Sequence, residues 1–150
     1  ATNPFVGALG DDLDFITYGF DRKIIDVLAN ASKDAIVGIN DHMVYGSAHP
    51  FMRKDYWLSG GGFPKAYKWY YGDTEIYELA RHADKWVFLE NVYAYHHNIA
   101  LEGKVNYKIQ ELEPKLLTGP ELLSIDRPTY LRRLKWWRDN SRPRNIPEGV

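Results

Sequence analysis

The 150-residue chain contains no cysteine, which excludes disulfides and thiolate metal ligands. No apolar run approaches the roughly 20 residues that a membrane-spanning helix needs. The opening ATNPF has neither the basic region nor the long apolar segment of a signal peptide. The formal net charge is only -1, which argues against a protein that coats nucleic acid. We therefore expect no transmembrane segment, no nucleic-acid partner and a cytoplasmic location.

What the chain does contain is typical of a globular protein. Hydrophobic residues make up 45% and charged residues 26% of a length that suits one domain of ordinary size. The aromatic content of 15% is high, with 5 Trp and 11 Tyr. Aromatic rings fill cores, and they also line sugar and base pockets, so this content alone does not identify a ligand.

The first part of the chain reads as strand, helix, strand. Residues Phe5–Leu9 and Ala35–Ile39 are short apolar runs of the kind that form buried strands. Between them, Asp21 can cap a helix that extends to about Ala31. This order favours an α/β fold with a parallel crossover between the two strands.

The remaining elements fit the same class. A helix is expected from Asp73 or Thr74 to His82, followed by one or two strands within Lys85–His97. Beyond Gly103, Asp126 is a plausible cap for a helix that runs to about Asp139, with Pro128 in its first turn. We divide the chain into residues 1–103, the α/β part, and residues 104–150, a C-terminal helical arm with a basic tail.

Three carboxylates follow the first strand within four positions: Asp11, Asp12 and Asp14. Aspartate is common in solvated turns, so a simple turn is one interpretation. The other is a cation site, because Mg²⁺ and Mn²⁺ prefer oxygen ligands and are often held by one or two carboxylates plus substrate phosphates. A metal would also relieve the repulsion within the cluster.

A glycine-rich loop leads into the second helix and offers further candidates. Such a loop allows the backbone to approach a ligand closely. Asp73 and Glu75 are either ordinary first-turn acids that complement the helix dipole or, for Asp73, a general base. Nearby aromatic rings belong either to the core or to a sugar-stacking surface. The candidate acceptor-site residues are Trp57, Gly60, Gly61, Gly62, Asp73 and Glu75.

Two histidines end the last predicted strand. Because successive strand residues point to opposite faces, only one of His96 and His97 should face a given site. Neutral imidazole is a common ligand for Mn²⁺-type ions, although a lone histidine is more often a surface or core residue. The basic residues of the C-terminal part form a solvated face or meet a phosphate, an acidic lipid or a partner chain. They are Arg132, Arg133, Lys135, Arg138, Arg142 and Arg144.

Taken in order, these segments resemble a glycosyltransferase of the GT-A fold, in the large inverting, family-2-like group that includes bacterial and phage sugar transferases. The segments that carry the resemblance are PFVGALGDDLDF, AIVGIND, WLSGGGFPKAYKWYYGDTEIYELARHAD and VYAYHH. They cover Pro4–His97 and begin at the Asp-x-Asp strand, so the match is to the C-terminal, acceptor-side half of such an enzyme. The resemblance implies a partial Rossmann-like GT-A fold, a mixed sheet flanked by helices, and exposed sheet edges that favour a homodimer.

The resemblance also implies roles for individual residues. Asp12 and Asp14 match the Asp-x-Asp that holds Mn²⁺ or Mg²⁺ against the nucleotide-sugar diphosphate, with Asp11 beside them, and His96 or His97 matches the histidine that completes the metal site. Asp73 matches the base that deprotonates the acceptor hydroxyl, but Gly72 stands where the family often has glutamate. The implied partners are a nucleotide-sugar donor and a carbohydrate-type acceptor.

Two other functions remain open. One is a sugar- or nucleotide-binding or assembly module of the same ancestry that performs no turnover. The other is a metal-dependent hydrolase or nuclease that uses the aspartate cluster with His96 or His97. No nuclease motif supports the second alternative, and the near-neutral charge counts against it.

Overall fold

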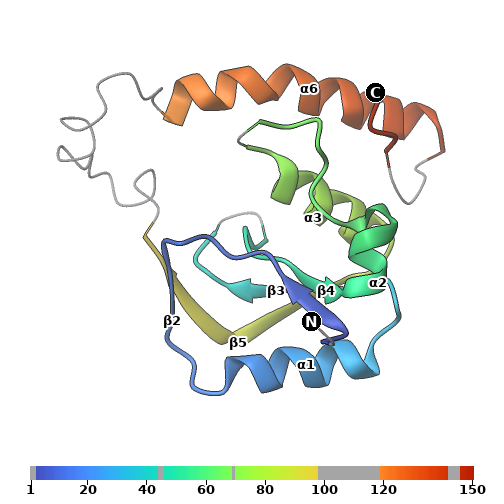
Figure 1. Cartoon of the computed structure of the whole chain (residues 1–150). Helices are drawn as coiled ribbons and strands as arrows, with labels where there is room; N and C mark the ends of the chain where they lie inside the picture. The colour runs from blue at the N-terminus through green and yellow to red at the C-terminus, as the bar shows by residue number, and fades with distance from the viewer. Residues whose placement is uncertain (1–2, 44–45, 69, 98–118, 142–145) are drawn as a thin grey trace, which may run out of the picture.

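The computed structural model describes residues 3–43, 46–68, 70–97, 119–141 and 146–150. Figure 1 shows a sheet with α1 along one face and helices above the other. The elements are β1 (Phe5–Gly7), β2 (Leu13–Phe15), α1 (Phe20–Asn30), β3 (Ile36–Asn40), β4 (Phe51–Arg53), α2 (Lys54–Tyr56), the π-helical turn η1 (Trp57–Gly61), α3 (Gly72–His82), β5 (Trp86–His96) and α6 (Gly119–Asp139).

A five-stranded mixed sheet with the order β1-β4-β3-β5-β2 organises the fold. The central strand β3 pairs in parallel with β5 and antiparallel with β4. Four of its five residues are buried, as expected for a strand covered on both faces. The expectation of an α/β protein with a mixed sheet and flanking helices is therefore confirmed at this level.

The first strand differs from the expectation in extent and in position. β1 ends at Gly7 rather than Leu9, is only partly buried, and lies at the edge of the sheet. It runs in the same direction as β3, but β4 lies between them and is antiparallel to both. The adjacent parallel pair is β3 and β5, which α3 connects.

Two apolar clusters hold the helices on opposite faces of the sheet. Ile24 and Leu28 of α1 pack against Val37, Ile39 and Val92 on one face. A helical spacing of four residues places Ile24 and Leu28 on the same side of α1. Burying one such side chain stabilises the fold by about 1.5–3 kcal/mol, so α1 is firmly docked.

The other face carries α2 and α3. Ile76 and Ala80 of α3 pack there against Ile36, Met52 and Tyr56. The predicted helix from Asp73 or Thr74 to His82 is thus confirmed within two residues at its start. Asp73 in its first turn lies near His49, which follows β3, and His96, which ends β5.

The long strand β5 changes partners along its length. Its first half pairs with β3, and its last residues pair with β2. An irregularity opposite Ile39 and Asn40 interrupts the ladder, after which Val92 and Ala94 are buried while Tyr93 and Tyr95 are exposed. Alternation therefore places His96 on the inner face, together with Val92 and Ala94.

The C-terminal helix is longer than expected and begins elsewhere. α6 starts at Gly119, so the prediction that Asp126 caps it is wrong. Asp126 is buried inside α6 and accepts hydrogen bonds from the backbone amides of Lys68 and Tyr70, at 3.1 and 2.9 Å. This arm lies over α3 (Figure 1), and Tyr130 stacks on Tyr71 at 4.8 Å between ring centroids.

The proposed boundary at residues 103 and 104 lies outside the described residues. Within the described part of the chain, no helix combines the length and the apolar character needed to cross a membrane.

Candidate functional site

An open cleft of about 780 Å³ lies where the β1–β2 turn, the β3–β4 connection, the start of α3 and the end of β5 meet. These segments are far apart in sequence, and the sheet brings their ends to one place. Titratable side chains from all of them line the cleft: Asp11, Asp12, His49, Tyr67, Asp73 and His96. Four of these six residues were predicted as site residues from the sequence.

Asp12, His49 and His96 form a cluster of metal-ligand type. One ligand atom from each of the three lies within 4.8 Å of the other two. The Nε2 atom of His96 is 3.3 Å from Oδ2 of Asp12, and the two imidazole rings meet edge to face with centroids 4.7 Å apart. Carboxylate oxygen and imidazole nitrogen are both ligands for divalent transition metals, so the donor set fits such an ion.

Two further observations support the fit. The side chain of His96 is only 8% exposed, so its imidazole is enclosed beside the Asp12 carboxylate rather than solvated. A Cβ atom built at Gly10 would lie 2.4 Å from Oδ1 of Asp12 and 3.3 Å from Nε2 of His49. Glycine at position 10 therefore leaves the space that the carboxylate and the imidazole occupy.

His49 is held in place by Asp41, at the end of β3. The ring atom Nδ1 of His49 lies 2.9 Å from Oδ2 of Asp41, which also accepts hydrogen bonds from Ser47 Oγ and the Ala48 amide. Burial alone would raise the pKa of Asp41, but the hydrogen bonds from His49 and Ser47 outweigh it, and the pKa lies below its ordinary value. Asp41 is thus an ionised carboxylate, fully buried and fully hydrogen-bonded.

Asp14 and His97 lie elsewhere. Asp14 is in β2, where alternation directs it away from Leu13 and towards solvent. Its Oδ2 is 2.8 Å from Nε2 of His97, and both side chains are well exposed. The two halves of the Asp-x-Asp therefore face different ways: Asp12 contacts His96 at the cleft, and Asp14 contacts His97 outside it.

Asp73 lies at the opening turn of α3 and lines the cleft. Burial raises its pKa above the ordinary value, although backbone hydrogen bonds in its own turn lower it. The charges of His49 and Asp41 also act on it, in opposite senses. A carboxylate with a raised pKa in a cleft is a candidate general base.

The backbone just before Asp73 leaves no room for a side chain at position 72. Tyr71 has a φ of 70°, an unusual value for a bulky residue, and it turns the chain sharply into α3. A Cβ atom at Gly72 would approach Cδ1 of Phe63 to 2.6 Å. Phe63 therefore occupies the space that a side chain at position 72 would need.

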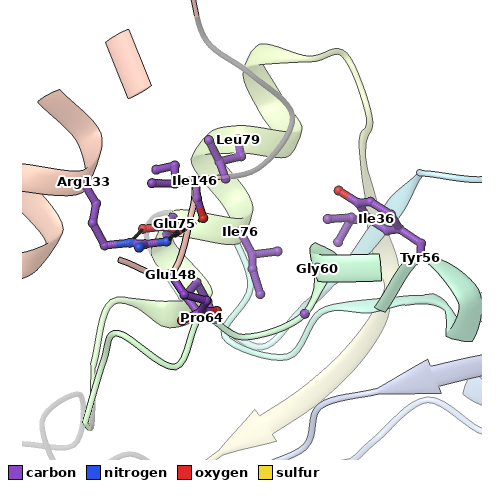
Figure 2. Close-up of a pocket in the computed structure, with 11 residues that line it drawn as sticks. Ile36, Tyr56, Gly60, Pro64, Glu75, Ile76, Leu79, Arg133, Ile146 and Glu148 are labelled. Carbon is purple, nitrogen blue, oxygen red and sulfur yellow. Dashed lines mark hydrogen bonds and ion pairs between the residues drawn. The ribbon is translucent and has the colours of Figure 1, made fainter. Parts of the chain in front are cut away.

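Three of the other predicted acceptor-site residues line a separate, smaller cavity (Figure 2). Gly60, Gly62 and Glu75 line this cavity of about 30 Å³. Trp57 lies over Gly62 and contacts Phe63, a cleft residue, edge to face at 5.8 Å. Gly61 closes the η1 turn. Of the six predicted acceptor-site residues, Asp73 alone lines the cleft in the described part of the chain.

Glu75 belongs to a buried ion pair. Arg133 of α6 reaches it with two nitrogens, each 2.9 Å from one carboxylate oxygen (Figure 2). The Tyr67 hydroxyl donates a hydrogen bond to the same carboxylate at 2.5 Å. Arg133 also donates to the Pro147 and Ile146 carbonyls. The prediction that the basic residues of α6 form a solvated or ligand-binding face is therefore wrong for Arg133, which is 1% exposed.

Sequence reasoning missed Asp41 and His49 as a pair. Asp41 follows β3 and His49 precedes β4, and these strands are antiparallel neighbours. Residues at the end of one such strand and the start of the next lie opposite each other, so a hairpin-like pairing of AIVGIND with HPFM would have indicated the contact. The alternation of Val92 and Ala94 would likewise have selected His96 over His97.

Comparison of the chain with protein-family models, with curated proteins and with solved structures finds no match.

Proposed function

We propose that the protein is a metal-dependent glycosyltransferase that moves a sugar from a nucleotide-sugar donor to an acceptor hydroxyl with inversion. One observation carries the proposal: Asp12 and Asp73, predicted separately as a metal ligand and a base, line the same cleft together with His96. The cleft also has the size of a small-molecule site. The resemblance of the motif order to GT-A enzymes supplies the reaction type.

Asp73 would act as the general base. Its carboxylate would accept the proton of the acceptor hydroxyl while that oxygen attacks the anomeric carbon of the donor sugar. The bond from the anomeric carbon to the diphosphate breaks as the new glycosidic bond forms, so the products are an inverted glycoside and a nucleoside diphosphate. A raised pKa makes the Asp73 carboxylate a stronger proton acceptor than an ordinary aspartate.

Asp12 and His96 would hold the divalent metal, and Asp11 lies beside them on the rim of the cleft. The ion would neutralise charge on the leaving diphosphate as a Lewis acid. Phe63, Tyr67 and Tyr70 also line the cleft, and aromatic rings of this kind would give a sugar ring flat surfaces on which to pack.

A donor-turnover assay tests the proposal. The full chain is incubated with Mn²⁺, a panel of uridine, guanosine and thymidine diphosphate sugars and a mixture of carbohydrate acceptors, and the released nucleoside diphosphate is measured. We expect acceptor-dependent release with at least one donor. Asp73→Asn should slow it by about 10²–10⁴-fold while donor binding stays unchanged.

Asp26→Asn is the matched control, because Asp26 is exposed on α1, which packs on the other face of the sheet. It should retain full turnover. Wild-type turnover by Asp73→Asn would contradict the role of Asp73 as base. Donor binding without any turnover would instead support a binding module, and metal-dependent release of free sugar without acceptor would support a hydrolase.

A further inference from the structure

The cleft holds a second buried histidine that the resemblance does not account for. His49 is 3% exposed, and its Nε2 atom faces the position where Asp12 and Gly10 meet. Its other ring nitrogen is engaged by Asp41. A histidine that is fixed at one nitrogen and presents the other to a carboxylate and a second imidazole has the arrangement of a metal ligand.

Asp41 determines which nitrogen of His49 carries the proton. Oδ2 of Asp41 has three contacts: 2.9 Å to His49 Nδ1, 2.8 Å to Ser47 Oγ and 2.9 Å to the Ala48 amide nitrogen. Because this oxygen already accepts from the hydroxyl and the amide, it is an acceptor for His49 as well, and Nδ1 of His49 is assigned as the donor. With Nδ1 engaged by Asp41, the ring nitrogen left for a ligand is Nε2, which lies near Asp12 at Gly10.

His96 supplies the independent observation. Its side chain is 8% exposed, and Nε2 lies 3.3 Å from Oδ2 of Asp12, so a buried imidazole nitrogen is already placed against the carboxylate. Ligands about 2.0–2.2 Å from one shared ion are separated by about 3–4 Å, so atoms already within 4.8 Å need only small side-chain movements to converge.

We propose that Asp12, His49 and His96 bind a single divalent transition-metal ion, with Asp41 orienting His49, and that this site selects Mn²⁺, Co²⁺ and Zn²⁺ over Mg²⁺. Two imidazoles and one carboxylate are a poor match for Mg²⁺, which prefers oxygen ligands and retains its waters. We expect the affinity to increase in the order Mg²⁺, Mn²⁺, Co²⁺, Zn²⁺, with Zn²⁺ bound most tightly. The three protein ligands leave positions open for diphosphate oxygens.

This inference deepens the proposed function, and the catalytic role of the ion rests on that proposed function. Binding of the ion is independent of the proposed function, because the metal site needs no nucleotide sugar to form. The sequence alone predicted either Mn²⁺ or Mg²⁺. His49 favours Mn²⁺ because it adds a second imidazole to the ligand set. Asp14 and His97 are not ligands in this arrangement, since they pair with each other outside the cleft.

Calorimetric titration of the chelator-treated full chain with each metal chloride tests the site. We expect one Mn²⁺, Co²⁺ or Zn²⁺ per chain and Mg²⁺ binding at least 100-fold weaker than Mn²⁺. Visible absorption of the Co²⁺ form reports nitrogen ligation independently of heat. Circular dichroism melting curves establish that each variant is folded.

His49→Asn is the decisive variant, because the asparagine amide can still donate to Asp41 while the ligand nitrogen is removed. It should weaken Mn²⁺ binding at least 100-fold, as should His96→Asn. Asp41→Asn should weaken it by about 10–100-fold, the usual effect of losing the partner that orients a ligand. His97→Asn is the matched control and should change the affinity less than twofold.

Wild-type Mn²⁺ affinity in folded His49→Asn, or equal affinities for Mg²⁺ and Mn²⁺, would overturn the inference. Selective metal binding without turnover of any nucleotide sugar would support the site and contradict the transferase. Turnover that is unaffected by His49→Asn would support the transferase and overturn this metal site.

Discussion

Asp73 and Glu75 lie two residues apart in the first turn of α3, yet their carboxylates have very different surroundings. Glu75 is enclosed by Arg133 and Tyr67, with both oxygens hydrogen-bonded. Asp73 lines an open cleft with a raised pKa, and among the described residues no arginine or lysine forms an ion pair with it. A buried charge that is fully paired is costly to leave without its partner, whereas charge left available in a cleft is suited to a ligand or a reaction.

The largest effect should follow from breaking the satisfied pair. Arg133→Met leaves the buried Glu75 carboxylate uncompensated and removes the contacts of Arg133 with Pro147 and Ile146. We expect the free energy of unfolding to fall by about 3–5 kcal/mol, measured by urea denaturation.

The matched control for that variant is Arg132→Met, at an exposed position beside it on α6. It should change the unfolding free energy by less than about 0.5 kcal/mol. Equal effects of the two substitutions would show that the Arg133–Glu75 pair does not hold α6 in place.

The next effect should appear at the cleft, in binding rather than in stability. Gly10→Ala places a methyl group against Oδ1 of Asp12, and the carboxylate has to move aside. We expect Mn²⁺ affinity to fall about tenfold, or about 1.4 kcal/mol, with little change in melting temperature. A methyl group added at Gly149 has no atom within 4 Å, so Gly149→Ala serves as the control. Unchanged Mn²⁺ affinity in Gly10→Ala would indicate that Asp12 is not a metal ligand.

A smaller effect with the opposite sign is expected at Asp73. Its pKa is raised in the folded state, so the contribution of Asp73 to the unfolding free energy decreases as pH rises from about 4 through the folded pKa. Asp73→Asn removes this loss. It should melt at a higher temperature than the wild type at pH 7 and at nearly the same temperature near pH 3. A variant less stable than the wild type at pH 7 would show that the Asp73 charge stabilises the fold.

The smallest effect should come from the exposed pair. Asp14→Asn removes one partner of an ion pair on the surface, where such pairs contribute about 0–1 kcal/mol. We expect the free energy of unfolding to change by less than about 0.5 kcal/mol and the Mn²⁺ affinity to stay the same. A large loss of Mn²⁺ affinity would indicate that Asp14 is a metal ligand, as the Asp-x-Asp resemblance implied.

The sequence predicted the elements that have a regular apolar period. Ile24 and Leu28 indicated α1, the run before Asn40 indicated the central strand, and the pattern after Asp73 indicated α3. Each of these signals depends on local spacing, which follows directly from the geometry of helices and strands. The insertion of β4 between β1 and β3 is a long-range pairing that no local period encodes.

The site was predicted in part for the same reason. Asp12 and Asp73 follow recognisable local features, a strand end and a helix start. His49 and the buried state of Arg133 depend on contacts with Asp41 and Glu75, which come from elements distant in the sequence. Only the folded arrangement of β3 with β4, and of α3 with α6, makes these pairs visible.

The measurement that tests the account most directly is the metal dependence of nucleoside diphosphate release from the donor panel. The account predicts that chelation of metal stops the release and that Mn²⁺ restores it far more effectively than Mg²⁺ at equal concentration. Release that continues in the presence of chelator, or no release from any donor at saturating Mn²⁺, would contradict it.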